Sequence, residues 1–126
     1  MRTGRSVLSA LMAGVVALIC APSASATEVV TYEIVSDTVA SATVQYQDEV
    51  RRVFAGLVRL PWRADVVVSS VRGAPPQGSQ VRADWRPLRA PNRWVSVRII
   101  HAGEVICQTT LDIGSAACYG ITQRIT

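Results

Sequence analysis

The sequence predicts an all-β protein, built as an antiparallel β-sandwich of about eight strands. Apolar and polar residues alternate with a period of two through most of residues 27–126, which is typical of strands that bury one face. Turn-forming Gly, Pro and Asp residues separate these segments at intervals of about 8 to 12 residues. The same part of the chain lacks the 3.6-residue period of an amphipathic helix.

Residues 1–26 have the layout of a secretory signal peptide. Two arginines make the start positive, residues 7–21 are mainly apolar, and small residues lead to a cleavage position after Ala26. The apolar run is shorter than the ~20 residues that a membrane-spanning helix needs. We therefore expect a cleaved signal helix, an extracytoplasmic protein and one mature domain at residues 27–126.

Two alternatives for this leader stay open. An uncleaved leader would anchor the domain to the membrane. Lipid attachment at Cys20 is the weaker alternative, because lipidation needs a small residue just before the cysteine and Ile19 is large and branched.

The strands follow from the apolar positions taken in order. Residues 28–36 and 40–47 alternate without interruption, and residues 52–60 end at Pro61, which has no N–H for a sheet ladder. Residues 73–78 and 87–92 carry Gly and Pro and predict loops. For the third strand, the expected faces are Val53, Ala55 and Leu57 on one side and Phe54 and Val58 on the other. The remaining predicted strands are residues 63–69, 80–85, 94–101, 104–109 and 116–121.

Cys107 and Cys118 fall on the last two predicted strands and are the two cysteines of residues 27–126. An even pair in an oxidising compartment predicts a disulfide. We expect the two strands to pair as a hairpin, which would bring the cysteines face to face. A metal site built on two thiolates without neighbouring His or carboxylate residues is the weaker interpretation.

Charge and residue usage argue against several functions. Each leader arginine carries one charge, so losing both lowers the net charge from +4 to +2. That charge is too small for the strong basic surface of a nucleic-acid-binding protein. The single histidine, His101, lies at a predicted turn without an identifiable nucleophile or orienting partner. We therefore expect neither an enzyme nor a bound metal or cofactor.

One segment carries a binding hypothesis. Arginine and tryptophan are enriched in binding hot spots, and the Arg fork suits carboxylates and phosphates. A loop rich in both would contact a protein partner or anionic head groups. In the competing interpretation, which we favour, the tryptophans face the core or stack under arginine side chains, and the arginines only keep the loop soluble. The candidate residues are Trp85, Arg86, Arg89, Arg93 and Trp94.

Several short motifs occur in a fixed order along the mature chain. They are VTYEI at residues 30–34, ATVQYQD at 42–48, LPW at 60–62, VSVRI at 95–99, Gly103, and the Gly114…Cys118 ending. In order and spacing they resemble the mycobacterial membrane protein small (MmpS) family, the accessory proteins of MmpL transporters. The resemblance implies an immunoglobulin-like sandwich of about seven to eight strands, with Trp62 in its core.

The resemblance also implies a role. Members assist RND-superfamily transporters that move lipids or siderophores across the envelope, so the expected partner is such a transporter or another envelope protein. Two features depart from the family: the leader looks cleavable, and the first mature cysteine is Cys107 instead of a residue near Val97. The alternative function is a freely secreted sandwich that binds a small apolar or lipid ligand between its sheets or at its loop end.

Overall fold

The structure is a computed structural model that describes residues 27–126. The predicted signal helix, its cleavage position and Cys20 lie outside these residues. All eight predicted strands are present, and two short elements are added that residue periodicity did not predict. The elements are β1 Glu28–Val35, β2 Ser41–Gln47, β3 Arg52–Arg59, β4 Trp62–Val68, β5 Gln80–Asp84, the 3₁₀ helix η1 Arg86–Leu88, β6 Val95–His101, β7 Glu104–Leu111, β8 Ser115–Tyr119 and β9 Arg124–Ile125.

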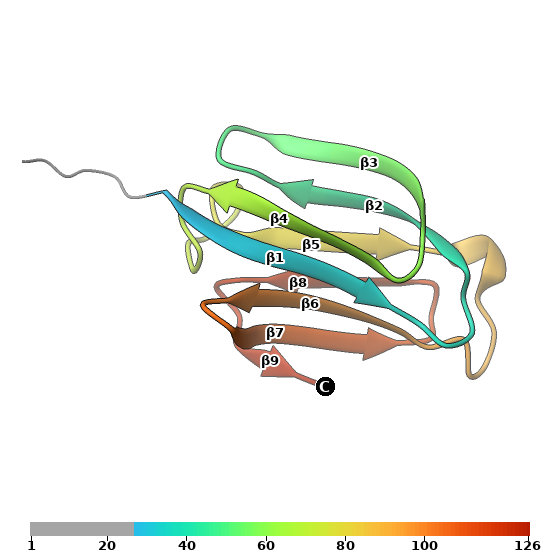
Figure 1. Ribbon diagram of the computed structural model, residues 1–126. Coiled ribbons are helices and arrows are strands. Elements are labelled where there is room, and N and C mark those ends of the chain that lie inside the picture. Colours follow the sequence, from blue (N-terminus) through green and yellow to red (C-terminus); the bar gives the residue numbers. More distant parts are fainter. Residues whose placement is uncertain (1–26) are drawn as a thin grey trace, which may run out of the picture.

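The strands form two sheets that pack as a β-sandwich (Figure 1). One sheet has the order β4-β1-β6-β7-β9, and the other has the order β3-β2-β5-β8. Every pair is antiparallel except β7 with the short β9. The prediction of an all-β fold with two largely antiparallel sheets is confirmed. The part of the chain that is described contains no helix long and apolar enough to cross a membrane.

The core lies between the two sheets and is built from the inward positions of the alternating strands. Because side chains on a strand point to opposite faces in turn, Val30, Tyr32 and Ile34 of β1 and Ala42 and Val44 of β2 are buried. Trp62 is partly buried and packs against this core, with its ring 5.8 Å from that of Tyr46. The largest fully buried side chains are Trp85, Tyr32, Ile34, Ile99, Val30, Val44, Val68, Val81, Val95, Val97, Cys107 and Cys118.

Tyr32 fastens one sheet to the other by hydrogen bonds. Its hydroxyl on β1 donates to the backbone oxygen of Gln47 on β2, at 2.7 Å, and accepts the backbone N–H of Gln80 on β5, at 3.1 Å. Burial raises the pKa of the Tyr32 phenol above its ordinary value, and the bond from the Gln80 N–H lowers it in part. One buried hydroxyl therefore satisfies two backbone groups of the opposite sheet.

The disulfide between Cys107 and Cys118 is present, with 5.9 Å between the two Cα atoms. The expected hairpin pairing around it is wrong. β7 pairs with β6 and β9, whereas β8 pairs with β5 in the other sheet. The segment between β7 and β8 thus crosses from one sheet to the other, and the disulfide joins the sheets across the core.

The expected faces of β3 are also wrong. The register of β3 against β2 shifts after Val44, so Gly56 lies opposite Val44 and Phe54 lies opposite Gln45, with Ala55 unpaired. Such a β-bulge inserts one extra residue and reverses the inward–outward phase beyond it. Phe54 and Leu57 both face solvent as a result.

We predict that breaking the disulfide weakens the fold without abolishing it. The two cysteines are 11 positions apart in sequence, with residues 108–117 between them. Constraint of a loop of this size stabilises the folded state by about 3 kcal/mol in the chain-entropy model, or about 10–20 °C in Tm for a domain of this size. Thermal unfolding with and without reductant measures the effect, and the C107A/C118A variant should not respond to reductant. An unchanged wild-type midpoint in reductant would contradict the prediction.

We predict that Tyr32→Phe lowers the free energy of unfolding at pH 7 by about 3 kcal/mol, because two buried backbone groups lose their partner. The unfolded phenol ionises near pH 10, whereas the folded one keeps its proton to higher pH. Above about pH 10 the unfolded state then binds fewer protons, so wild-type stability falls as pH rises. Denaturant titrations from pH 7 to 11 should show the difference from the variant shrinking. A difference that stays constant over that range would refute the buried phenol's role.

Candidate interaction surface at the distal end of the sandwich

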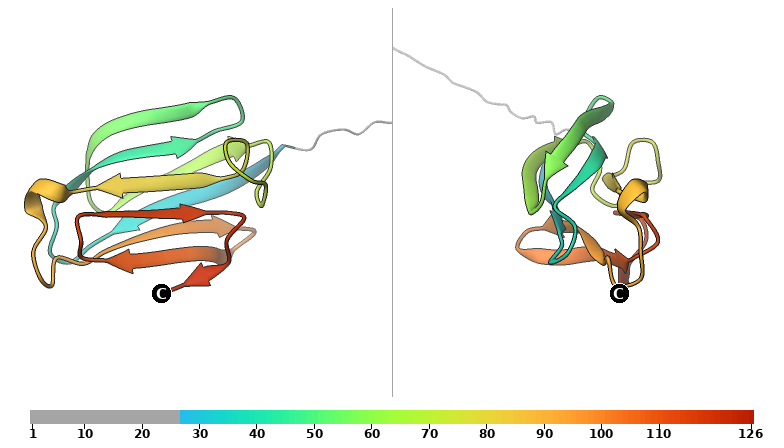
Figure 2. Two further views of the ribbon diagram at one scale, coloured as in Figure 1. Left: turned by 180° about the vertical axis from the view of Figure 1, so that it is seen from behind. Right: turned by 90° about the vertical axis from the view of Figure 1, so that its right-hand side faces the viewer.

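The two ends of the sandwich carry different loops (Figures 1 and 2). The chain enters β1 at Glu28, next to the end of β4 and the turn after β6; we call this the entry end. Loops of residues 36–40, 85–94 and 112–114 gather at the opposite end, which we call the distal end. A strand of eight residues spans about 25 Å, so the Arg/Trp segment lies far from the entry point.

Trp85 belongs to the core and not to the surface. Trp85 is 2% exposed. Its backbone N–H donates to the backbone oxygen of Gly114 at 2.7 Å, and its backbone oxygen accepts the N–H of Leu88 at 2.8 Å. Its indole Nε1 has no hydrogen-bond partner in the described part of the chain. For Trp85 the core-facing interpretation holds, and this residue leaves the set of direct contact candidates.

η1 places the first arginine of the loop. Pro87 lies in its first turn, where a missing N–H costs nothing. The Arg86 guanidinium turns back onto the Asp84 carboxylate and holds the pKa of that carboxyl below its usual range. Arg86 is exposed but its charge is already matched by Asp84. Its main role is therefore to hold the loop in place, and its guanidinium charge is less available to a partner.

Gly114 fixes the place of this loop, and the sequence analysis missed it. Its φ of +102° is a conformation that favours glycine. A Cβ atom there would lie 2.8 Å from Cγ of Arg86 and 3.2 Å from Cβ of Arg89. The loop thus packs directly on the glycine backbone. A glycine in a predicted turn was the signal, but its contact with residues far along the chain is a property of the fold.

Arg89 and Arg93 extend from the same loop. Arg89 lines a shallow hollow of about 410 Å³ with Ala90, Pro91, Asp112 and Ile113. Arg93 donates through Nη1 to the Thr38 oxygen at 2.7 Å and so ties this loop to the loop after β1. Neither arginine forms an ion pair within residues 27–126.

Trp94 is the exposed aromatic side chain of the segment, at 48%. It precedes β6 and points to the outer face of the five-stranded sheet, since Val95 points inward. Ser36 donates through its hydroxyl to the Trp94 oxygen at 2.6 Å, which holds the backbone at this point. The side chain lines a hollow of about 440 Å³, whose other walls are Val35, Ser36, Asp37, Thr38, Asn92, Ser96, Arg98 and Thr110.

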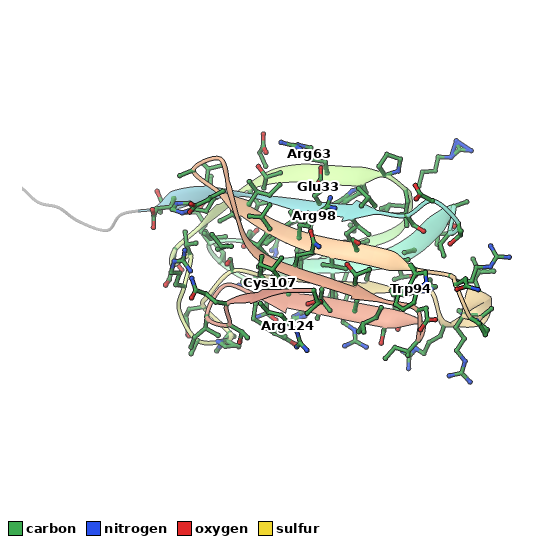
Figure 3. All side chains as sticks on the ribbon, turned by 90° about the horizontal axis from the view of Figure 1, so that it is seen from below. Glu33, Arg63, Trp94, Arg98, Cys107 and Arg124 are labelled. Atoms are coloured by element: carbon green, nitrogen blue, oxygen red, sulfur yellow. A yellow bond between two sulfur atoms is a disulfide. The ribbon has the colours of Figure 1, made fainter. Side chains whose placement is uncertain are left out.

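On the outer face of the five-stranded sheet, near Trp94, charged and polar side chains form a network of ion pairs and hydrogen bonds (Figure 3). Glu33 on β1 accepts from Arg98 on β6 at 2.8 Å and from Arg63 on β4 at 3.1 Å. Arg98 also donates to Gln108 on β7 at 2.6 Å. These side chains satisfy one another across four neighbouring strands. The charges of this network therefore satisfy one another, whereas Arg89 and Arg93 of the neighbouring loop form no ion pair within residues 27–126.

His101 lies at the entry end, where its Nε2 is 3.1 Å from Oε2 of Glu28, a partner 73 residues away in sequence. The described residues contain no group of three or more His, Cys, Asp or Glu side chains arranged to hold a metal ion. The geometry at the distal end is suited to contact with another molecule, through one aromatic face and nearby guanidinium groups.

We predict that the two tryptophans of the segment differ sharply in their effect on stability. Trp85→Ala should lower the free energy of unfolding by about 3–5 kcal/mol, because it opens a large cavity in the core. Trp94→Ala should lower it by less than about 1 kcal/mol, as is usual for surface positions. Urea titrations of both variants make the comparison. Equal losses would mean that Trp94 is a packing residue.

The sequence matches no protein-family model and no curated protein. We use the name distal surface for Arg86, Arg89, Arg93 and Trp94 together.

Proposed function

We propose that this protein is an exported, non-catalytic interaction domain of the cell envelope, similar to the MmpS accessory proteins of RND-type lipid or siderophore transporters. Support comes from the leader-like residues 1–26, from the ordered motifs of the mature chain, and from a two-sheet fold stapled by a disulfide. On this proposal the domain works by contact with a transporter or another envelope protein.

The distal surface is the observation that carries the proposal. A half-exposed tryptophan at the same end of the sandwich as two arginines that form no ion pair within residues 27–126 has the composition of a binding hot spot. It lies at the end of the sandwich farthest from Glu28, where the chain enters the domain. A domain tethered or delivered at its entry end would present this surface outward, toward the extracytoplasmic part of a partner.

We further propose that the sandwich is immunoglobulin-like. In that fold strand B lies beside E, while C lies between C′ and F, and F lies beside G. The neighbours of β1, β2, β3, β4, β5 and β8 follow the same order as B, C, C′, E, F and G. The β6–β7 hairpin then occupies the position of strand A beside β1, as an insertion between the F and G strands.

The packing weighs against a ligand held between the sheets, which is one form of the alternative function. Fully buried side chains such as Trp85, Tyr32 and Ile99 occupy the space there. The hollows beside Trp94 and Arg89 are open to solvent at the loop end. A small apolar or lipid ligand that binds at this loop end would therefore occupy the same distal surface that we assign to a protein partner.

Site-specific photo-crosslinking in the native host tests the proposal. A photoreactive amino acid at Ala90, in the distal loop, should capture an envelope protein with an extracytoplasmic domain, identified by mass spectrometry as an RND-type transporter. The matched control is the same amino acid at Gln77, in an exposed loop of the entry end. The R89A/W94A variant should reduce the yield at least tenfold, since hot-spot residues contribute about 2 kcal/mol or more.

Three results would contradict this assignment. Equal capture from both ends would remove the role of the distal surface. An unchanged yield in the double variant would show that Arg89 and Trp94 do not carry the contact. Capture of extractable lipid instead of protein at Ala90 would favour the alternative, a secreted lipid-binding module.

A further inference from the structure

β3 is an edge strand with exposed apolar side chains. It pairs with β2 on one side and is the last strand of the four-stranded sheet on the other (Figure 1). Phe54 is 73% exposed and Leu57 is 74% exposed, on the outer face of this sheet. Natural proteins usually protect an edge of this length, because its unpaired N–H and C=O groups can pair with another strand.

The β-bulge at Ala55 is what exposes both side chains. Positions 54 and 57 of a regular strand lie on opposite faces, because the side-chain period is two. The extra residue reverses the phase, so Phe54 lies over Gln45 and Leu57 over Thr43 on one face. Gly56 adopts φ +79°, and a Cβ atom there would meet nothing within 4 Å. Glycine is therefore favoured at this position because of its positive φ angle, and not because a larger side chain would collide with a neighbour.

The charged side chains within β3 itself, Arg52 and Arg59, are both positive, and the acidic residues nearest in sequence, Asp48 and Glu49, lie in the turn before the strand. Residues 50–64 contain four arginines and no acidic residue. Arg52 donates to the side-chain oxygens of Gln45 and Gln80, which are neutral. Within residues 27–126, no ion pair involves Arg51, Arg52 or Arg59. Arg52 and Arg59 therefore flank the two apolar side chains at the two ends of β3, and neither forms an ion pair within the described residues.

We propose that β3 is a docking edge for an extended, acidic strand of another protein. The partner strand would continue the four-stranded sheet through the free backbone groups of β3, as in other cases of strand addition. Its apolar side chains would cover Phe54 and Leu57, and its carboxylates would face Arg52 and Arg59. This edge lies on a different sheet from Trp94, so the inference is independent of the distal surface.

The same features disfavour two other occupants. A second copy pairing antiparallel about the centre of β3 would place Arg52 opposite Arg59 of its partner, and like charges directly opposite destabilise a strand pair. A lipid surface is best engaged by an amphipathic helix or a protruding loop whose apolar face sinks below the head groups. Phe54 and Leu57 instead lie on a sheet face beside polar Gln45 and Thr43.

A peptide as long as β3 provides the probe. The peptide Glu-Thr-Leu-Thr-Ile-Thr-Val-Glu, labelled with a fluorophore, is titrated with the exported protein and binding is followed by anisotropy. We expect saturable binding that weakens with salt. The same peptide with Lys in place of Glu should bind at least tenfold more weakly. A peptide with alternate N-methylated amides should also lose at least tenfold, because it cannot pair with the edge.

Variants of the protein locate the site. F54S/L57S should weaken binding of the acidic peptide at least tenfold, while its thermal midpoint stays close to that of the wild type because both side chains are exposed. The matched control is V29S/V67S, which removes two exposed apolar side chains from the outer face of the other sheet and should bind like the wild type. Equal affinity of F54S/L57S and the wild type would overturn the proposal.

Other outcomes would also overturn it. Undiminished binding of the N-methylated peptide would exclude strand addition. Concentration-dependent dimers in sedimentation that disappear in F54S/L57S, without peptide binding, would make a second copy the occupant. Binding to phosphatidylglycerol vesicles that is lost in the same variant, again without peptide binding, would make a lipid surface the occupant.

Discussion

One transverse layer through the sandwich holds the two sheets in a fixed relation. In one sheet Tyr32, Ile99 and Cys107 lie side by side; in the other Tyr46, Val81 and Cys118 do. At one side of this layer the two tyrosine rings are 5.5 Å apart, and at the other the disulfide joins β7 to β8. The Tyr32 hydroxyl adds two hydrogen bonds to the opposite sheet. The disulfide, the tyrosine pair and the Tyr32 hydrogen bonds thus fix one alignment of the two sheets. That alignment determines where the loops at both ends lie.

The distal surface depends on that alignment through Trp85 and Gly114. Trp85 continues the inward phase of β5, and its backbone pairs with Gly114 in the turn after β7. The loop that follows packs on the glycine, and Arg93 ties it to the loop after β1. The exposed side chains of the distal loop are therefore held by the buried contact between Trp85, which follows β5 of one sheet, and Gly114, which follows β7 of the other. Such support limits the entropy that a binding surface loses when it contacts a partner.

Local pattern determined what could be predicted. Each predicted strand boundary lies within two residues of the observed one, because period-two alternation is a property of a single strand. The crossing of the chain between β7 and β8 has no such signal, since a turn looks the same whether it closes a hairpin or changes sheets. The bulge at Ala55 was hidden because both phases of β3 are apolar. The favoured interpretation placed both tryptophans alike and is wrong for Trp94, which is exposed, although strand phase distinguishes them: Trp85 is in step with Val81, and Trp94 is out of step with Val95. η1 and β9 are too short to show any period.

The arginines divide the surface into matched and unmatched parts. On the outer face of the five-stranded sheet, Glu33 lies between Arg63 and Arg98, so two cations and one anion share a network that includes Gln108. Arg52 on β3 and Arg93 in the distal loop donate to neutral oxygens, and Arg89 forms no ion pair among the described residues, whereas Arg86 of the same loop is paired with Asp84. Unmatched cations beside exposed apolar side chains gain the most from an acidic partner, because both the charge and the apolar area are then satisfied in one contact. The distribution of carboxylates, more than that of arginines, decides which faces of this small domain are free to bind.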